Sequence, residues 1–517
     1  MRLIGVIAPV AVVLVWQLVE SAGLLNYEYL PAPLEVLAAA AELIQTGKLV
    51  NAVSHTLRIT LAAATLSMVL GAAVGLAIGL LPKLRVYLVA SIDFLRAIPA
   101  AALVPVAVMA FGPSATTELM LVVYAALWPV VLCTAAGAAS VHPRQYDVAR
   151  MLHLSRSATI RKIVIPAAVP AWLIGARLSA VIALLVSIVA EMLMNLRGLG
   201  GALVQSLNAL APARMWAYAL ICGVIGFALN AVLSRIVRLV LPGSPANTDD
   251  HIDVSIQGAA LQPRSSLRGL LPLVLVLVAW QLFGHNDSVF FPPPAQWVTA
   301  IGRVHGSGLL MPAATQTLSI FVLGLALATV IGGAVGVAIG ASRRVDHALT
   351  PSIAFLAAVP AAAVVPVAAL LLGPTQLSGV VVVGLIVAWP ILLAAVTAMR
   401  TVPTVRLEMS RTLGLTPLQR WTKVIVPSLA PGVMLGVRIA SAMALIVTLL
   451  VDIFGVGAGL GRLLVESQQR FEAATAWGLL LMIGAFGYLT SALLARVGRR
   501  VYIERDNTLP NWSSRSI

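Results

Sequence analysis

Charged side chains are scarce in this chain. They make up 10% of its 517 residues, whereas hydrophobic residues make up 60% and the mean hydropathy is +0.99. A soluble core cannot use so much apolar length, so the composition excludes a soluble globular protein and predicts a polytopic membrane protein. Cysteine is also rare. The only two, Cys133 and Cys222, lie inside apolar segments, so no disulfide framework is implied.

Motifs for nucleotide and metal binding are missing as well. The chain has no G-x-x-x-x-G-K-[ST] phosphate loop, so it does not bind ATP by that route. It has no metal-ligand spacing and no nucleophile elbow, and its seven histidines are scattered. We therefore expect no catalytic site, no metal site, no cofactor bound by this chain and no enzymatic activity of its own.

Apolar runs divide the chain into membrane spans of about 20 residues, the length that crosses a bilayer. We expect six spans in the first half, at 3–19, 57–81, 87–111, 117–138, 172–193 and 215–240, and six in the second half, at 270–283, 318–341, 348–372, 378–399, 433–454 and 476–498. The run at 270–283 is weak. The first run could also be a signal peptide, but its VLVWQL segment recurs as LVAWQL around Trp280, so we expect a transmembrane helix there.

The net charge of +15 could suggest a nucleic-acid partner, but in a membrane protein the position of the charges matters more. With the N-terminus inside, most Lys and Arg residues fall in cytoplasmic segments, as the positive-inside rule requires. We therefore expect both termini in the cytoplasm, the lipid bilayer as surroundings and no nucleic acid.

The two halves repeat each other at an offset of 261 residues. The offset relates Pro31 to Pro292 and Thr56 to Thr317, and it also relates the Trp-Pro pairs that begin at Trp128 and Trp389. We expect a first domain at 1–240, a polar cytoplasmic linker at 241–269, a second domain at 270–500 and a polar tail at 501–517. Two six-span copies share one orientation, so a pseudo-two-fold axis along the membrane normal follows.

Glycines four residues apart mark the second span of each copy. They are Gly71, Gly75 and Gly79 in the first half and Gly332, Gly336 and Gly340 in the second. This spacing makes a flat strip that lets another helix approach closely, so we interpret it as a packing surface.

Two cationic stretches between spans, at 146–170 and 407–431, carry the same pattern of residues. An acid is followed six residues later by a histidine or a glycine, then by a β-branched residue and a proline. The positions are Asp147, His153, Ile163 and Pro166 in the first copy and Glu408, Gly414, Val424 and Pro427 in the second. Each stretch ends in a further proline, Pro170 or Pro431, which we expect to stop a helix before the next span.

This pattern resembles the coupling loop of binding-protein-dependent ABC permeases, in which an E-A-A triplet, a glycine and an I-x-L-P ending form two short helices that dock onto an ATPase. The first copy has Asp147 for glutamate and His153 for glycine but keeps Ala149, whereas the second keeps Glu408 and Gly414 but has Ser410 for alanine. The acids are expected to cap the short helix or to contact the ATPase. His153 is expected to make the two docking contacts unequal.

The resemblance implies an all-α fold of two tandem six-helix type I ABC importer domains, about 12 transmembrane helices in total. It further implies two copies of an ATP-binding subunit carrying ATP and Mg, an extracytoplasmic solute-binding protein, a small solute and a bacterial inner-membrane location. The segment Phe94–Gly112 and the Leu-Gly pairs at Leu199 and Leu460 look like those of permeases for nitrate, sulfonate and taurine. A stand-alone secondary transporter fits the composition and the repeat but has no use for the two loops, and a channel or scaffold fits least.

Charges inside spans are costly and are therefore candidates for function. Asp93 and Arg96 lie three residues apart in the third span, where the second half has Ala354 and Ala357. Arg96 is a candidate for assisting an anionic solute; the alternative is that the two residues neutralise each other on one helix face.

The fifth span of each copy carries an acid near its outer end and an arginine near its inner end. The acids Glu191 and Asp452 are candidates for pairing or gating, and Arg177 and Arg438 are candidates for helix pairing. The third span is broken by proline in both copies, and such breaks are suited either to a pathway or hinge or to packing alone. The prolines are Pro99, Pro105, Pro360 and Pro366.

Overall fold

The structure, a computed structural model, describes residues 4–23, 28–195, 197–240, 267–342, 361–455 and 458–507, with positions 345, 349 and 353. The described residues form helices and loops and no strand. The first half comprises α1 (Ile4–Ser21), α2 (Pro33–Gln45), α3 (Lys48–Leu80), α4 (Pro82–Ala97), α5 (Ala100–Phe111), α6 (Ala115–Ala139), α7 (Pro143–Met151), α8 (Arg156–Thr159), the π-helical turn η1 (Ile160–Val164), α9 (Ile165–Met194), α10 (Leu199–Asn208) and α11 (Pro212–Val240).

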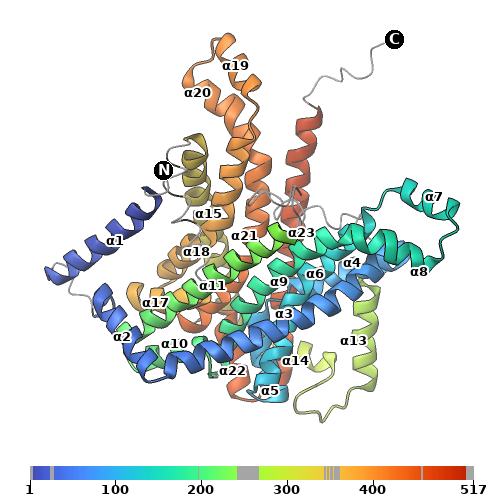
Figure 1. The fold of residues 1–517 in the computed structure, drawn as a ribbon. Coiled ribbons are helices and arrows are strands. Elements are labelled where there is room, and N and C mark those ends of the chain that lie inside the picture. The colour runs from blue at the N-terminus through green and yellow to red at the C-terminus, as the bar shows by residue number, and fades with distance from the viewer. Residues whose placement is uncertain are drawn as a thin grey trace.

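The second half repeats this order (Figure 1). It comprises the 3-10 turn η3 (Leu267–Leu270), α13 (Leu271–Phe283), α14 (Pro294–Gly306), α15 (Leu310–Ala341), α17 (Ala361–Leu372), α18 (Gln376–Arg400), α19 (Thr404–Thr412), α20 (Pro417–Arg420), the π-helical turn η4 (Trp421–Ile425), α21 (Val426–Phe454), α22 (Leu460–Gln469) and α23 (Ala473–Asn507). The expected linker at 241–269 lies largely outside the described residues.

Most of the expected spans appear as long apolar helices. In the described part of the chain, eight helices are long and apolar enough to cross a membrane, and the bent pair α4–α5 makes a ninth. α13 is short, with 13 residues, as the weak apolar run at 270–283 predicts. The expected span at 348–372 is described only in part, as α17. The chain is therefore a helical polytopic membrane protein.

The expected third span, 87–111, is two helices and not one. α4 and α5 meet at an angle of 83°, and Pro99 stands at the N-cap of α5 with extended backbone angles. The break falls at Pro99 because the residue before a proline is disfavoured in helical conformation. Pro105 lies inside α5 and Pro366 inside α17 without ending either helix. Pro360 lies outside the described residues.

The glycine strips pack the second span against the fourth in both halves, as predicted. A Cβ atom on Gly75 would stand 2.7 Å from the Val131 carbonyl oxygen of α6, and one on Gly336 would stand 2.5 Å from the Leu392 carbonyl oxygen of α18. Only glycine allows the backbones of α3 and α6, or of α15 and α18, to approach this closely. These two helix pairs form the frame of each half.

Each half packs one of its helices against the other half. α5 of the first half contacts α21, α22 and α23 of the second, and α17 of the second half contacts α9, α10 and α11 of the first. The elbow at Ile98 fits against glycines of α23, because a Cβ atom on Gly484 would stand 2.7 Å from an Ile98 side-chain carbon. The largest buried apolar cluster contains residues of both halves, among them Val106 and Val367. Because α5 and α17 make equivalent contacts with the opposite halves, the two halves pack with the pseudo-two-fold relation that the repeat predicts.

Candidate functional site: two protruding loops and two buried carboxylate clamps

The repeated cationic stretches form two protrusions, which we call the twin loops (142–164 and 403–425). In Figure 1 they stand out from the helical body, α7 and α8 at the right and α19 and α20 at the top. Each begins after a span, forms one short helix of nine residues and turns sharply into a second helical segment. The same local structure therefore arises twice from two divergent sequences.

The sharp turn is made at His153 and Gly414, the two aligned positions of the sequence pattern. Both have a left-handed backbone, with φ of 49° and 64°. The Leu154 amide donates to the Ala149 carbonyl at 3.0 Å and the Leu415 amide to the Ser410 carbonyl at 3.1 Å, which is the hydrogen-bond pattern of a Schellman helix ending. Glycine adopts this conformation freely, whereas histidine does so at a cost of about 1 kcal/mol.

The helix that follows each turn does not stop at the prolines, contrary to our expectation for Pro170 and Pro431. Residues 156–194 and 417–454 each form one continuous helical rod that includes the expected fifth span. A π-helical turn precedes Pro166 and Pro427, in which the Ile165 amide bonds to the Ile160 carbonyl five residues back. This wide turn accommodates a proline, which lacks a hydrogen-bond donor and needs extra room. Each loop is thus continuous with a transmembrane helix.

Some positions of the repeated loop pattern are buried and others are exposed. Ala149 is 3% exposed and Ser410 is 1% exposed, so this position requires a small side chain. Ile163 and Val424 are half-buried under the first short helix, whereas Pro166 and Pro427 are exposed. A cavity of about 490 Å³ lies between α7 and the start of α9, lined by Ile163, Pro166 and others.

Neither acid of the loops caps a helix, so that part of our expectation is wrong. The His142 side chain accepts from the Arg144 amide at the start of α7, and the cap of α19 is Pro403, which has no side-chain hydrogen bond. Asp147 is exposed and forms an ion pair with Arg150, one turn further along. The carboxylates of Asp147 and Glu408 are therefore available to an external surface.

A buried carboxylate clamp closes the other end of the rod in each half. The Thr56 hydroxyl donates to Glu191 Oε1 at 2.7 Å and accepts from the Leu199 amide at 3.0 Å, while the Gly200 amide donates to Glu191 Oε2 at 2.9 Å. Both Thr56 and Glu191 are fully buried. The clamp joins α3, the end of α9 and the start of α10, where free backbone amides favour a negative charge.

The second half repeats the clamp with its own residues. The Thr317 hydroxyl donates to Asp452 Oδ2 at 2.7 Å and accepts from the Leu460 amide at 2.8 Å, and the Gly461 amide donates to the same oxygen at 3.3 Å. Glu191 and Asp452 thus hold helices together, in agreement with the pairing alternative. The sequence analysis noted Thr56 and Thr317 only as repeat positions, and their role depends on long-range contacts that no local pattern indicates.

The first half adds a second buried carboxylate that the sequence analysis missed. His55 Nε2 lies 3.0 Å from Glu118 Oε2, and the Ser187 hydroxyl donates to Glu118 Oε1 at 2.8 Å. At the offset of 261 the second half has Gln316, Gly379 and Thr448 in these places. The sequence could have indicated this site, because His55 and Glu118 are ionisable whereas the matching residues of the second copy are not.

The remaining intramembrane charges have partners. Asp93 and Arg96 form an ion pair of 2.8 Å on the surface of α4, each about one-third exposed, as the neutralisation alternative predicts. Arg177 bonds to the Asn230 side-chain oxygen of α11 at 3.2 Å, so it pairs helices within its half. Arg438 also has an interaction, and its helix-pairing role stays a prediction.

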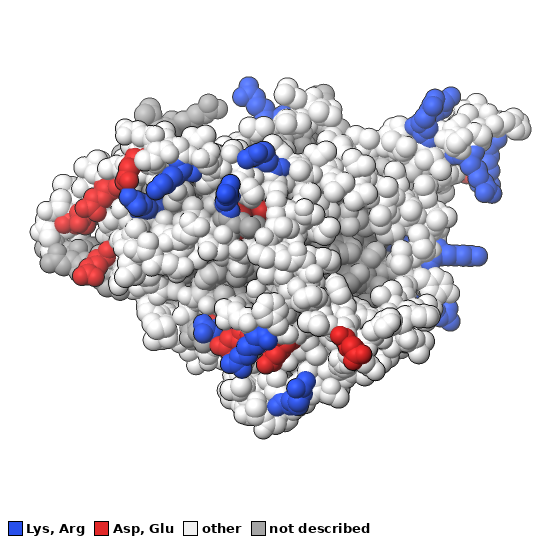
Figure 2. All heavy atoms as spheres, turned by 90° about the horizontal axis from the view of Figure 1, so that it is seen from below, with Lys and Arg blue, Asp and Glu red and all other residues white. Residues whose placement is uncertain are grey.

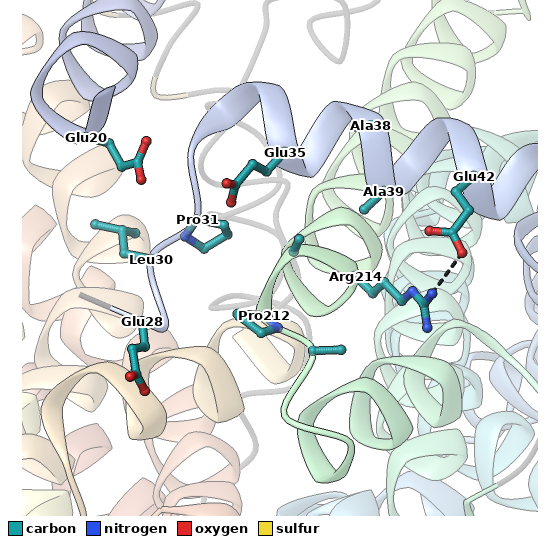
Figure 3. Close-up of a pocket in the computed structure, with 12 residues that line it drawn as sticks. Glu20, Glu28, Leu30, Pro31, Glu35, Ala38, Ala39, Glu42, Pro212 and Arg214 are labelled. Atoms are coloured by element: carbon teal, nitrogen blue, oxygen red, sulfur yellow. Dashed lines mark hydrogen bonds and ion pairs between the residues drawn. The ribbon is translucent and has the colours of Figure 1, made fainter. Parts of the chain in front are cut away.

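A hollow rich in glutamates lies between α1, α2 and α11, far from the loop of the first half. It encloses about 780 Å³ and includes Glu20, Glu28, Glu35, Glu42 and Arg214 in its lining, with an ion pair of 2.8 Å between the last two (Figure 3). Figure 2 shows acidic side chains gathered at this end of the lower face. The second half has Gln281, Val289, Gln296 and Arg303 in place of the four glutamates, so the hollow is specific to the first half.

Comparison with known proteins assigns a family to both halves. Residues 67–244 and 309–502 each match the family described as "Binding-protein-dependent transport system inner membrane component". An aliphatic sulfonates transport permease protein of Bacillus subtilis, SsuC, is 30% identical over 241 residues, 46% of this chain and 86% of that protein. The nitrate import permease protein NrtB of Synechocystis is 28% identical over 46% of this chain and 88% of its own length. The bicarbonate transport system permease protein CmpB of the same organism is 27% identical over 41% and 80%.

Proposed function

Because the chain belongs to the family of binding-protein-dependent transport system inner membrane components, we propose that it forms the complete membrane pore of an ATP-driven importer. One chain supplies both permease domains, which a single-domain relative would have to supply as two subunits. The observation that carries the proposal is the pair of protruding loops with the same turn and the same continuous helix. A protein that moves solute without an external motor has no evident use for them.

The twin loops are the proposed contacts of two ATP-binding subunits, which we take to be a homodimer with ATP and Mg bound on those subunits. A rigid connection supports this role, since the helix that leaves each loop runs unbroken to the buried clamp at Glu191 or Asp452. A displacement of the loop would therefore be transmitted along the helix to α10 or α22. Exposed arginines near the turn, such as Arg156 and Arg411, favour an acidic partner surface.

Alternating access is the proposed transport mechanism. ATP binding would draw the twin loops together and open the pore toward the outer face, and hydrolysis would reset it. The contacts of α5 and α17 with the opposite half are the part that would rearrange, because helices of the two halves meet there. The elbow at Pro99 lies in this interface, beside Gly484 and Gly487 of α23.

A small anion is the proposed class of solute. The relatives' names refer to sulfonates, nitrate and bicarbonate, all of which are anions. A solute-binding protein would deliver the anion to the outer face, and the hollow lined by Glu28, Glu35 and Glu42 is the proposed contact for a basic region of that protein. The location that follows is the inner membrane of a bacterium with the twin loops and both termini in the cytoplasm.

The test is charge reversal in the loops. The chain is co-expressed with its ATP-binding subunit, and the variants Asp147→Arg and Glu408→Arg are compared with Asp287→Arg, which makes the same change in an exposed loop of the second half. We expect the loop variants to lose co-purified ATPase and ATP-dependent uptake in proteoliposomes, with Asp287→Arg unchanged. Full ATPase binding and uptake in both loop variants would refute the docking assignment.

A further inference from the structure

The buried clamp is common to both halves, but the residues around it are not. Glu191 and Asp452 are both bound by a threonine hydroxyl and a backbone amide of the following helix. Among the described residues, only those of the first half place a second carboxylate, Glu118, and an imidazole, His55, beside the clamp. The clamp of the second half forms without these two groups, so the clamp does not require His55 or Glu118.

The three ionisable groups converge from three different helices. His55 comes from α3, Glu118 from the first turn of α6 and Glu191 from the last turns of α9. One ligand atom from each lies within 4.8 Å of the other two. Glu118 and Glu191 are fully buried, whereas the His55 side chain is 19% exposed. The cluster is thus closed on the protein side and open only at the imidazole.

The charge of this cluster is not balanced by the protein. The other donors to the two carboxylates are hydroxyl groups of Thr56 and Ser187 and the Gly200 amide, all of them neutral. Even with a protonated imidazole, two ionised carboxylates leave one negative charge in a medium of low dielectric constant, where an uncompensated charge is very costly. A bound cation removes this cost, as would a proton on one carboxylate, and the experiment below distinguishes the two.

We propose that His55, Glu118 and Glu191 bind a divalent transition-metal ion of the Zn²⁺ type. One imidazole and two carboxylates are ligands that Zn²⁺ accepts, at bond lengths of about 2.0–2.2 Å. A point equidistant from three atoms 4.8 Å apart lies about 2.8 Å from each, so the side chains need to move inward by less than about 1 Å. A water molecule entering beside His55 completes four ligands.

The surroundings of the cluster are those of a metal site and not only of an ion pair. Each carboxylate already accepts a hydrogen bond that fixes its orientation, Glu118 from Ser187 and Glu191 from Thr56 and Gly200. Such outer hydrogen bonds hold ligands in place in metalloproteins. The metal ties α3, α6 and α9 together at the end remote from the first loop, so it makes the first half the stiffer of the two.

The second half supplies the internal comparison. Its residues Gln316 and Gly379 provide neither an imidazole nor a carboxylate. There the buried Thr448 Oγ1 atom, at the position of Ser187, has no hydrogen-bond partner, as expected where the group corresponding to Glu118 is missing. One metal ion per chain follows, and not two.

The experiment measures metal content and needs neither the ATPase nor the solute, so it is independent of the proposed function. The purified full-length chain is treated with chelator, incubated with Zn²⁺ or Co²⁺, desalted and analysed by mass spectrometry for metal. We expect one metal ion per chain in the wild type and in the control Gln316→Ala, and at least a tenfold lower content in His55→Gln and in Glu118→Gln. Co²⁺ is expected to give visible absorption bands that both variants lose.

The metal content is measured on the monodisperse fraction from size-exclusion chromatography, and either of two results would overturn the proposal. If the wild type retains no metal, the cluster is neutralised by a proton instead. If His55→Gln and Glu118→Gln retain as much metal as Gln316→Ala, the ion is bound elsewhere. Two variants at different positions guard against a folding defect in one of them. Zn²⁺ is also expected to raise the unfolding temperature of the wild type but not that of His55→Gln.

Discussion

Replacement of Thr56 by valine tests the buried clamp most directly, because valine keeps the shape of threonine and removes only the hydroxyl. Besides a local contact with the Ala52 carbonyl of its own helix at 3.2 Å, that hydroxyl has two long-range partners, Glu191 Oε1 at 2.7 Å and the Leu199 amide at 3.0 Å. In the variant both partners remain buried and lose this bond. An unsatisfied buried polar group costs about 1–3 kcal/mol, so the two together predict a destabilisation of about 2–6 kcal/mol.

The control for this variant is Thr56→Ser, which retains the hydroxyl and loses one methyl group. In thermal unfolding of the detergent-purified chain, we expect Thr56→Val to unfold roughly 4 °C or more below the wild type, from about 2–4 °C per kcal/mol for a domain of this size. Thr56→Ser is expected to stay close to the wild type. Thr317→Val should reproduce the effect, because its bonds to Asp452 and Leu460 have nearly the same lengths.

Hydrogen exchange gives a local measurement of the same change. Loss of the Thr56 hydroxyl frees the Leu199 amide at the start of α10, so exchange in the first turn of α10 should accelerate while the middle of α3 stays protected. Equal unfolding temperatures of the valine and serine variants, together with unchanged exchange at α10, would show that the clamp contributes nothing and that the reasoning is wrong.

Three further predictions use contrasts that the chain itself provides. Gly336→Ala should disrupt the packing of α15 on α18 and lower stability, because its Cβ would stand 2.5 Å from a carbonyl oxygen, whereas Gly333→Ala, with nothing within 4 Å, should be neutral or stabilising in thermal unfolding. Gly414→Ala should destabilise by about 1 kcal/mol through its left-handed backbone alone, whereas His153→Gly should not destabilise; equal effects would contradict the conformational argument. Glu28→Gln should weaken binding of the solute-binding protein and reduce its salt dependence, and unchanged titration curves would exclude the acidic hollow as the contact.

The sequence by itself determined the features that depend on composition and on residues close together in the chain. Apolar length fixed the membrane class and most of the span positions, because a bilayer requires about 20 apolar residues per helix. The offset of 261 residues fixed the two domains. The aligned positions His153 and Gly414 were part of the repeated pattern, and the structure gives both of them a left-handed backbone.

Only the tertiary structure decided which distant residues meet. No local pattern joins Thr56 to Glu191 or His55 to Glu118, because these contacts span 135 and 63 residues and depend on how three helices pack. The continuation of the helix through Pro166 also escaped the sequence, since the π-helical turn that tolerates the proline is set by packing of the loop on the bundle. The sequence shows where prolines and intramembrane charges occur. The tertiary structure determines which distant residues satisfy the hydrogen bonds and charges of these residues.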